Sequence, residues 1–226
     1  MQKKLDKTLL QVVQILNKHK INYWICHGTL LGLVRDKKII SNNSDIDIAI
    51  WKNDHVKKKI IKIFSNHGYK KKKKFFMNDG LLTIKKKGMR NVDISLYEKS
   101  LNQKTVFFRN YHFRNNFCRI VDVLAKSKKY NGNFKFVIKN MSFIEPIAKK
   151  IKFFLIKKKY FYTQYGYFVP SKFFNNITTL KFKNLNIRAP KNYLDYLKCV
   201  YGKSWKIPIK KKFNWIKDSP STKKIN

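Results

Sequence analysis

The sequence predicts an α+β fold in which helices flank a single sheet. Apolar residues recur at helical spacing over residues 3–19, and acid alternates with isoleucine in a strand-like pattern over residues 45–51. Three further strand-like segments follow between residues 69 and 97. Helical and strand patterns in this irregular order favour an α+β plan around one sheet.

The first half of the chain supplies the elements in order. Residues 21–26 form a short apolar run typical of a buried strand, and residues 30–35 open a short helix. Residues 45–51 predict a strand with both aspartates on one face, since side chains alternate along a strand. Asn53-Asp54 can cap an amphipathic helix over residues 55–66.

Three strands are predicted next, over residues 69–76, 80–86 and 90–97, with turns at Asn78-Asp79-Gly80 and near Gly88. Short strands joined by tight turns pair with their neighbours in opposite directions. We therefore expect an antiparallel meander, in which the lysine run at the start of the first strand is a solvated segment.

The second half of the chain gives weaker signals. Residues 104–143 look like short strands and loops rich in aromatics, and residues 147–160 show a helical pattern. Pro190 begins a predicted helix that ends at Tyr201-Gly202. The expected organisation is a catalytic core (1–100), a C-terminal part of the same folded unit (101–216) and a disordered tail (217–226).

The composition is strongly basic. The 226 residues include 52 Lys or Arg against 12 Asp or Glu, a formal net charge of +40. Only six of the cations are Arg, and the abundant Lys, Ile, Asn, Phe and Tyr all have A/T-rich codons. Because nucleic-acid binders favour Arg for bidentate contacts, the lysine excess indicates a compositional bias and argues against a nucleic-acid partner.

Cysteines and apolar runs indicate the compartment. The three cysteines lack metal-ligand spacing, so we predict neither a disulfide framework nor a zinc site. The first residues contain no apolar signal segment, and no apolar run approaches the length of a transmembrane helix. We therefore expect a cytoplasmic protein whose lysines also allow peripheral contact with the anionic inner face of a membrane.

Acidic residues are rare, so a cluster of them is informative. Asp45 and Asp47 lie two residues apart on one face of a predicted strand, and Asp93 lies in a later apolar strand. Mg²⁺ prefers oxygen ligands and shares its shell with substrate phosphates. Three such carboxylates therefore predict a site for Mg²⁺, or Mn²⁺, and phosphoryl-transfer chemistry. Asp122, which is also flanked by apolar residues, is an alternative third carboxylate.

Gly28 and Thr29 form a predicted turn between a strand and a helix. Backbone amides there can approach a phosphate closely, because glycine has no side chain and a helix N-terminus favours anions. His27 could contact phosphate or act as a base, but a structural histidine is the simpler interpretation. Each signal is weak alone; the turn followed by paired aspartates and a third strand aspartate is more specific.

This order resembles the nucleotidyltransferase superfamily, and two motifs narrow the resemblance to the LicD family. They are Gly-Thr-Leu-Leu-Gly-Leu-Val-Arg at residues 28–35 and Asp-Ile-Asp-Ile at residues 45–48. Pro170, the Tyr-Leu-Asp-Tyr-Leu helix at residues 193–197 and Tyr201-Gly202 resemble the family's closing pattern. The family includes phosphocholine transferases and fukutin-type phospho-alditol transferases.

The resemblance implies a nucleotidyltransferase-like mixed sheet flanked by helices, with an α/β C-terminal extension. It implies Mg²⁺-dependent transfer of phosphocholine or a phospho-alditol from a CDP-activated donor. The acceptor would be a hydroxyl of a cell-surface glycan, such as a lipopolysaccharide, or of its lipid-linked precursor. Asp45 and Asp47 match the family's metal-binding aspartates, Asp93 its third catalytic carboxylate, and Gly28 and Thr29 its phosphate-contacting turn.

Alternatives remain open at this point. Arg35 matches a family arginine that implies pairing with the donor phosphate, but a structural ion pair with an aspartate is its alternative. A nucleotidyltransferase that adds a nucleotide to a small molecule, RNA or protein would use the same three carboxylates. A non-catalytic basic binding protein would not need them, and its affinity for an anionic partner would fall steeply with salt.

Overall fold

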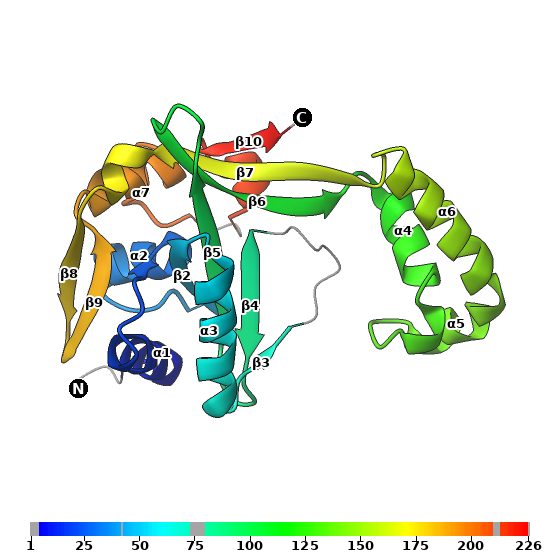
Figure 1. Cartoon of the computed structure of the whole chain (residues 1–226), viewed down its shortest axis with the longest axis horizontal. Coiled ribbons are helices and arrows are strands. Elements are labelled where there is room, and N and C mark those ends of the chain that lie inside the picture. Colours follow the sequence, from blue (N-terminus) through cyan, green and yellow to red (C-terminus); the bar gives the residue numbers. More distant parts are fainter. Residues whose placement is uncertain (1–4, 42, 73–79, 210–212, 226) are drawn as a thin grey trace. The chain divides into compact units, whose positions relative to one another are not determined.

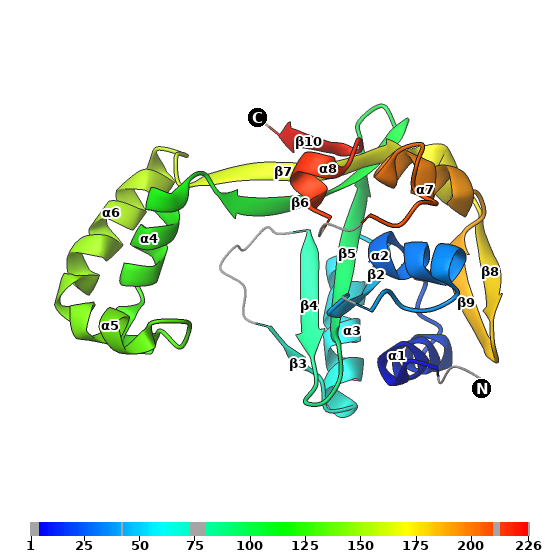
Figure 2. The same cartoon turned by 180° about the vertical axis from the view of Figure 1, so that it is seen from behind.

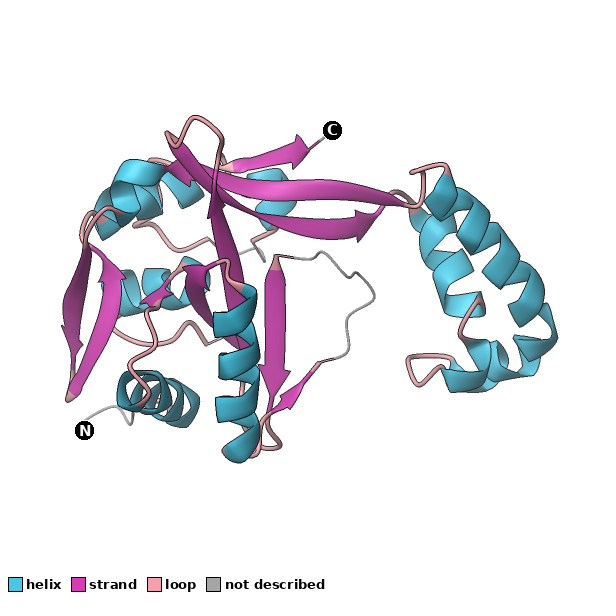
Figure 3. Cartoon of the chain, in the orientation of Figure 1, coloured by secondary structure: helices cyan, strands magenta, loops and turns pink. Residues whose placement is uncertain are grey.

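The computed structural model describes residues 5–41, 43–72, 80–209 and 213–225. These residues divide into two compact units, which we call the sheet unit and the helical unit (Figures 1 and 3). The sheet unit comprises Met1–Asn110 and Gly166–Lys223, and the helical unit comprises Tyr111–Tyr165 with Lys224–Asn226.

The helices and strands follow one another in an α+β order. In the first half they are α1 (Lys7–Lys18), β1 (Trp24–Ile25), α2 (His27–Leu31), the π-helical turn η1 (Gly32–Asp36), β2 (Asp45–Trp51), α3 (Asp54–Asn66), β3 (Lys70–Lys71), β4 (Leu81–Lys85), β5 (Asn91–Lys99) and β6 (Thr105–Phe113). In the second half they are α4 (Asn116–Leu124), α5 (Lys135–Asn140), α6 (Glu145–Lys157), β7 (Tyr162–Pro170), β8 (Ile177–Phe182), β9 (Leu185–Pro190), α7 (Tyr193–Tyr201), α8 (Trp215–Asp218) and β10 (Thr222–Ile225).

The sheet unit is built on β2 and β5, which pair in parallel. β1 is antiparallel to β2, and β4 pairs antiparallel with both β3 and β5. The antiparallel meander predicted for residues 69–97 is therefore confirmed, although the turn residues Asn78 and Asp79 lie outside the described part of the chain. β8 and β9 form a separate antiparallel hairpin (Figure 2).

The core of the sheet unit follows the predicted periodicities. Ile46, Ile48 and Ile50 of β2 are fully buried, and so are Leu9 and Leu16 of α1. Helix α3 covers one face of the sheet, in front of β5 in Figure 1 and behind it in Figure 2. The predicted first helix, the strand over residues 45–51 and the α+β plan with a mixed sheet flanked by helices are thus confirmed.

The helical unit differs from the expectation. Residues 104–143 were expected as short strands and loops, but β6 is followed by helices α4 and α5. Helix α4 begins after Asn115, whose side-chain oxygen accepts a hydrogen bond from the Cys118 amide at 2.9 Å. The buried residues Cys118, Val121 and Asp122 recur at helical spacing, although Phe117 is exposed, so a helical period is present in this short segment.

The end of the chain also differs. Residues from 217 onward were expected as a frayed tail, whereas α8 and β10 lie in this segment. The Asn214 side chain caps α8, and the Ser219 hydroxyl donates to the Val200 carbonyl at the end of α7 at 2.7 Å. Polar side chains such as Ser219 thus hold this segment through backbone hydrogen bonds. Pro190, the expected start of a helix, ends strand β9, and α7 begins after it.

Candidate active site

Strand register brings the three predicted aspartates together. In the parallel pair β2–β5, Asp47 lies directly opposite Asp93, and Asp45 lies two residues earlier on the same strand. Neighbouring residues in register share one face of a sheet, and residues two apart on a strand share it too. All three carboxylates are therefore on the face opposite the buried isoleucines of β2, and each side chain is partly exposed.

The predicted turn packs directly on this group. The Thr29 amide donates to Asp47 Oδ2 at 3.1 Å, and the Asp47 amide donates to Thr29 Oγ1 at 2.7 Å. A Cβ on Gly28 would lie only 3.2 Å from Asp47 Oδ2 and 3.0 Å from Asn43 Nδ2, so a side chain there would crowd the carboxylate. Both residues lie in the first turn of α2, and the Thr29 amide binds the aspartate.

His27 has a structural environment. Its backbone adopts a left-handed conformation with φ of 45°, which is unfavourable for a residue with a side chain. Its ring nitrogens lie 3.4 Å from the Tyr97 hydroxyl and 3.3 Å from the Tyr196 hydroxyl. Burial lowers the pKa of His27 to about 3, so the ring is neutral at physiological pH. Its strained backbone starts the turn that carries Gly28 and Thr29 onto Asp47.

The environment of Asp47 disfavours its ionised form. Burial raises the pKa of its carboxyl to about 8, with further contributions from the charges of Asp45 and Asp93. Among the described residues, no Lys or Arg forms an ion pair with Asp47 or Asp93. In a chain with a net charge of +40, two neighbouring aspartates without a described lysine or arginine ion pair are unusual.

The donor chemistry of this group fits a hard divalent cation, because carboxylate oxygens are the ligands that Mg²⁺ and Mn²⁺ prefer. Asp93 Oδ1 accepts a hydrogen bond from Thr83 Oγ1 at 2.6 Å, and Asp47 is held by Thr29. As placed, no three His, Cys, Asp or Glu side chains of the described residues surround one point closely enough to ligate a metal.

The sequence interpretation missed the residues that support the aspartates. Arg90, at the start of β5, donates to the Asn43 carbonyl and, through Nε, to Asp6 Oδ2 at 2.9 Å. Asn43 in turn donates its side-chain amide to the Asp45 carbonyl at 3.2 Å. Asn43, two residues before Asp45, was a usable signal, whereas the role of Arg90 depends on long-range pairing that spacing does not reveal.

Arg35 forms the structural ion pair that was its alternative interpretation. Its Nε and Nη2 donate to the two carboxylate oxygens of Asp36 at 2.7 and 2.9 Å, and Nη1 lies 3.5 Å from the Trp205 carbonyl. A bidentate pair of this kind is a strong, directional interaction. The predicted contact of Arg35 with a donor phosphate would have to compete with it.

Asp122, the rival third carboxylate, has a different environment from Asp93. It is buried in the helical unit, where its two oxygens accept from Lys126 and Lys152. Asp93 instead lies in register beside Asp47. The geometry therefore favours Asp93 as the third member of the group.

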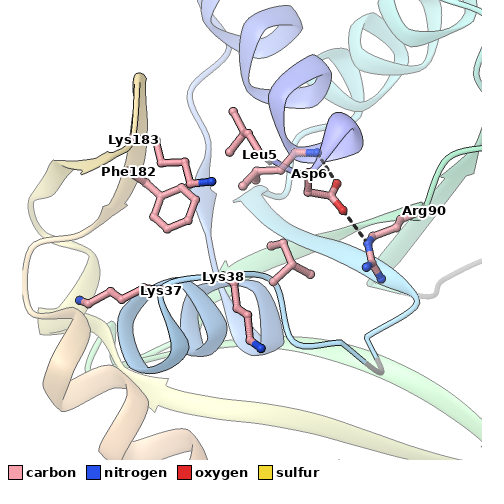
Figure 4. A pocket seen from close by; sticks show the side chains of 9 residues that line it. Leu5, Asp6, Lys37, Lys38, Arg90, Phe182 and Lys183 are labelled. Carbon is pink, nitrogen blue, oxygen red and sulfur yellow. Dashed lines mark hydrogen bonds and ion pairs between the residues drawn. The ribbon is translucent and has the colours of Figure 1, made fainter. Parts of the chain in front are cut away.

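A basic pocket of about 200 Å³ is lined in part by Arg90, which supports the loop before the aspartates (Figure 4). Its basic residues come from three separate segments of the sheet unit: they are Lys37, Lys38, Arg90 and Lys183. Leu5, Leu9, Ile39 and Phe182 give it an apolar wall, and Asp6 pairs with Arg90 at its edge. Because Arg90 also holds the Asn43 carbonyl, this pocket is linked directly to the loop before Asp45.

Comparison with known proteins places these features in context. The family model for LicD/FKTN/FKRP, nucleotidyltransferase domain, matches residues 20–143, which include the turn and all three aspartates. The human ribitol-5-phosphate transferase FKTN is 26% identical over 220 residues, and its counterpart from Macaca fascicularis is 25% identical. The match covers 97% of this chain but only 37% of the length of either relative.

Two more distant similarities were found. An uncharacterized protein of Rickettsia typhi, RT0683, is 42% identical over 58 residues, 25% of this chain and 19% of that protein. The solved structure of the lincosamide antibiotic adenylyltransferase LnuA bound to lincomycin shares 12% identity and has a TM-score of 0.45, with 86% of each chain covered.

Proposed function

Because the chain belongs to the LicD/FKTN/FKRP nucleotidyltransferase-domain family, we propose that it is a phosphotransferase that modifies a glycan. The relatives' printed activity, transfer of ribitol 5-phosphate, favours a phospho-alditol as the transferred group. In the finer form of this proposal, the donor is a CDP-activated alditol or choline. The acceptor is then a hydroxyl of a cell-surface glycan or its lipid-linked precursor.

The observation that carries the proposal is the register that sets Asp47 opposite Asp93, with Asp45 on the same face. We propose that these three carboxylates hold Mg²⁺ or Mn²⁺, which would supply positive charge to a donor diphosphate and its leaving group. Thr29 orients Asp47 through its amide, and Thr83 orients Asp93 through its hydroxyl. Asp93 would also take the proton of the attacking hydroxyl as the general base.

The electrostatics of the site support this assignment. Burial, together with repulsion from the charges of Asp45 and Asp93, raises the pKa of Asp47. A phosphate-bearing donor is also an anion and would be repelled by this group alone. A divalent cation therefore makes binding of the donor compatible with the aspartates, and the surrounding lysine-rich chain adds long-range attraction.

The test is to incubate the purified chain with Mg²⁺, a panel of glycan acceptors, and either a CDP-alditol, CDP-choline, CTP or ATP. We expect release of CMP from a CDP-linked donor and a mass increase of one acceptor equal to the phospho-alcohol. Asp45→Asn and Asp47→Asn should abolish release. Asp195→Asn, which alters an exposed aspartate on α7, is the matched control and should leave it unchanged.

The family description also supports a second candidate, a nucleotidyltransferase that transfers a nucleotide to a small molecule, RNA or protein. The same carboxylates would serve, so only the consumed donor separates the two reactions. Release of pyrophosphate from CTP or ATP, without consumption of a CDP-linked donor, would replace the first proposal by the second. If no donor is consumed under any condition, both enzymatic proposals are wrong.

A further inference from the structure

The helical unit exposes a large amount of apolar surface. Twelve of its large apolar side chains are exposed, whereas five apolar residues between Tyr111 and Tyr165 are buried. The most exposed among them include Phe134, Phe136, Phe143, Ile147, Phe153 and Phe154. Contiguous exposed apolar residues mark a surface that binds something, because each would otherwise order water at a cost in free energy.

Helix α6 carries part of this surface along one flank. Its inner side packs on α4 through Ala148, and Lys152 of the same helix pairs with the buried Asp122 at 2.7 Å. Ile147, Ile151 and Phe154 are spaced by four and three residues, so they form one stripe along the helix. All three are exposed, and we call them the α6 stripe.

The charge around the stripe is almost entirely positive. Residues 111–165 contain thirteen Lys or Arg and two acids, a formal net charge of +11. Both acids already have partners, since Asp122 pairs with two lysines and Glu145 pairs with Lys149 at 2.7 Å. The surface therefore offers lysine ammonium groups and apolar side chains together, with no free carboxylate in this range to oppose an anion.

The helices are too short to cross a bilayer. Helix α6 has 13 residues, and no helix in the described part of the chain is long and apolar enough to span a membrane. A spanning helix needs about 20 apolar residues. A short helix with an apolar stripe and flanking lysines instead lies in the plane of the membrane interface, where long lysine side chains reach back to the phosphates.

We propose that the helical unit docks on the surface of an anionic lipid bilayer, with the α6 stripe in the interface. Two of the three residues of the α6 stripe are isoleucine, which fits acyl chains but cannot stack on bases. Only two of the thirteen cations are Arg, the residue that nucleic-acid sites favour. This inference goes beyond the proposed function and does not depend on which donor the sheet unit uses.

The experiment is flotation of the full chain with vesicles of pure phosphatidylcholine, or of phosphatidylcholine with 30% phosphatidylserine. We expect flotation with the anionic vesicles that weakens at high salt, since each interfacial lysine strengthens binding by about fivefold. The variant Ile147→Ser/Ile151→Ser/Phe154→Ser should bind anionic vesicles at least about tenfold more weakly, because it removes the apolar anchor.

The matched control replaces three exposed apolar residues of the sheet unit, as Leu194→Ser/Ile207→Ser/Ile209→Ser, and should bind vesicles as the unmodified chain does. Circular dichroism establishes that each variant is folded. As a second readout, Phe154→Trp should show a blue-shifted tryptophan emission when anionic vesicles are added.

Three results would overturn the inference. The chain could fail to float with anionic vesicles, or the α6 stripe variant could float as well as the unmodified chain. A second copy of the chain could also cover the stripe. Light scattering would then show a dimer that the triple variant abolishes, and the tryptophan emission of Phe154→Trp would not change when lipid is added.

Discussion

The sheet unit and the helical unit use apolar residues in opposite ways. The sheet unit has a continuous core of 39 buried apolar residues and exposes four large apolar side chains among those described. The helical unit has a buried apolar cluster of three residues and exposes twelve. A large core fixes the positions of side chains, which is what a site built from three aspartates on two strands requires. A small core with an apolar exterior instead suits a unit that is completed by a surface it binds.

The two units also differ in whether their acidic residues form ion pairs. Both acids of the helical unit between residues 111 and 165 are paired with lysines. In the sheet unit, Asp47 and Asp93 share a face of the sheet and have no lysine or arginine ion pair among the described residues. Buried or clustered charges without partners raise the free energy of the folded state. Aspartates without an opposite charge in the sheet unit therefore indicate function, and paired acids in the helical unit indicate structure.

The largest expected effect is on turnover. Asp47→Asn keeps the size of the side chain but removes its charge, so we expect donor consumption to fall by at least about a thousand-fold. Asp122→Asn changes the paired acid of the helical unit and should leave the rate constant of the reaction unchanged once the variant is folded. Rates are measured by CMP release at saturating donor. An equal loss of activity in Asp47→Asn and Asp122→Asn would contradict the assignment of a catalytic role to Asp47 and a structural role to Asp122.

Substitutions of apolar residues in the two units should differ in their effect on the free energy of unfolding. Ile48→Ala opens a cavity in the core of the sheet unit and should lower the free energy of unfolding by about 3 to 4 kcal/mol. Ile147→Ala, at a side chain that is 59% exposed in the helical unit, should change it by less than about 0.5 kcal/mol. Urea unfolding followed by circular dichroism measures both. A large loss from Ile147→Ala would mean that its surface is buried within the free protein.

Acid should weaken the sheet unit through His27. Its pKa is about 3 when folded and near the ordinary 6.5 when unfolded, so the unfolded chain binds the extra proton. Stability contributed by the neutral ring is therefore complete above pH 6.5 and is lost as the pH falls toward 3. We expect a loss of about 2 kcal/mol between pH 7 and pH 5. In His27→Gln this part of the pH dependence should disappear; if it persists, another group causes it.

An effect of opposite sign is expected from Asp47. Its raised folded pKa means that ionisation costs stability, and the cost grows as the pH rises from about 4 to about 8. Asp47→Asn should therefore stabilise the chain more at pH 7.5 than at pH 4 in the presence of a chelator. Thermal unfolding at pH 4 and 7.5 measures it, with Asp195→Asn as control. If Asp47→Asn destabilises the chain at both pH 4 and pH 7.5, Asp47 is a structural residue.

The comparison of the two units also shows what the sequence could predict. The alternation around Asp45 and Asp47 predicted a strand and its buried isoleucines, because in a well-packed sheet unit burial follows periodicity. The parallel register that brings Asp93 to Asp47 depends on long-range pairing, so spacing could suggest the third carboxylate but could not exclude Asp122. The sequence allowed Arg35 to contact a donor phosphate or to form a structural ion pair with an aspartate. The adjacent Asp36 was the signal for the ion pair.

The helical unit was less predictable for a physical reason. Helix α4 has only nine residues, and the set that it buries at helical spacing includes the acid Asp122 beside Cys118 and Val121. Aromatic residues in the same region then favoured strands by their intrinsic propensity. The prediction was therefore wrong where apolar residues serve an exterior surface instead of the core.

The central claim is that Asp45, Asp47 and Asp93 form a cation site in the sheet unit. The most direct test is titration of the metal-free chain with Mn²⁺, followed by electron paramagnetic resonance of the free ion. We expect saturable Mn²⁺ binding that Mg²⁺ displaces, that is lost in Asp45→Asn/Asp47→Asn, and that is unchanged in Asp195→Asn and Asp122→Asn. Absence of saturable binding in the unmodified chain, or equal binding in the double variant, would contradict the account.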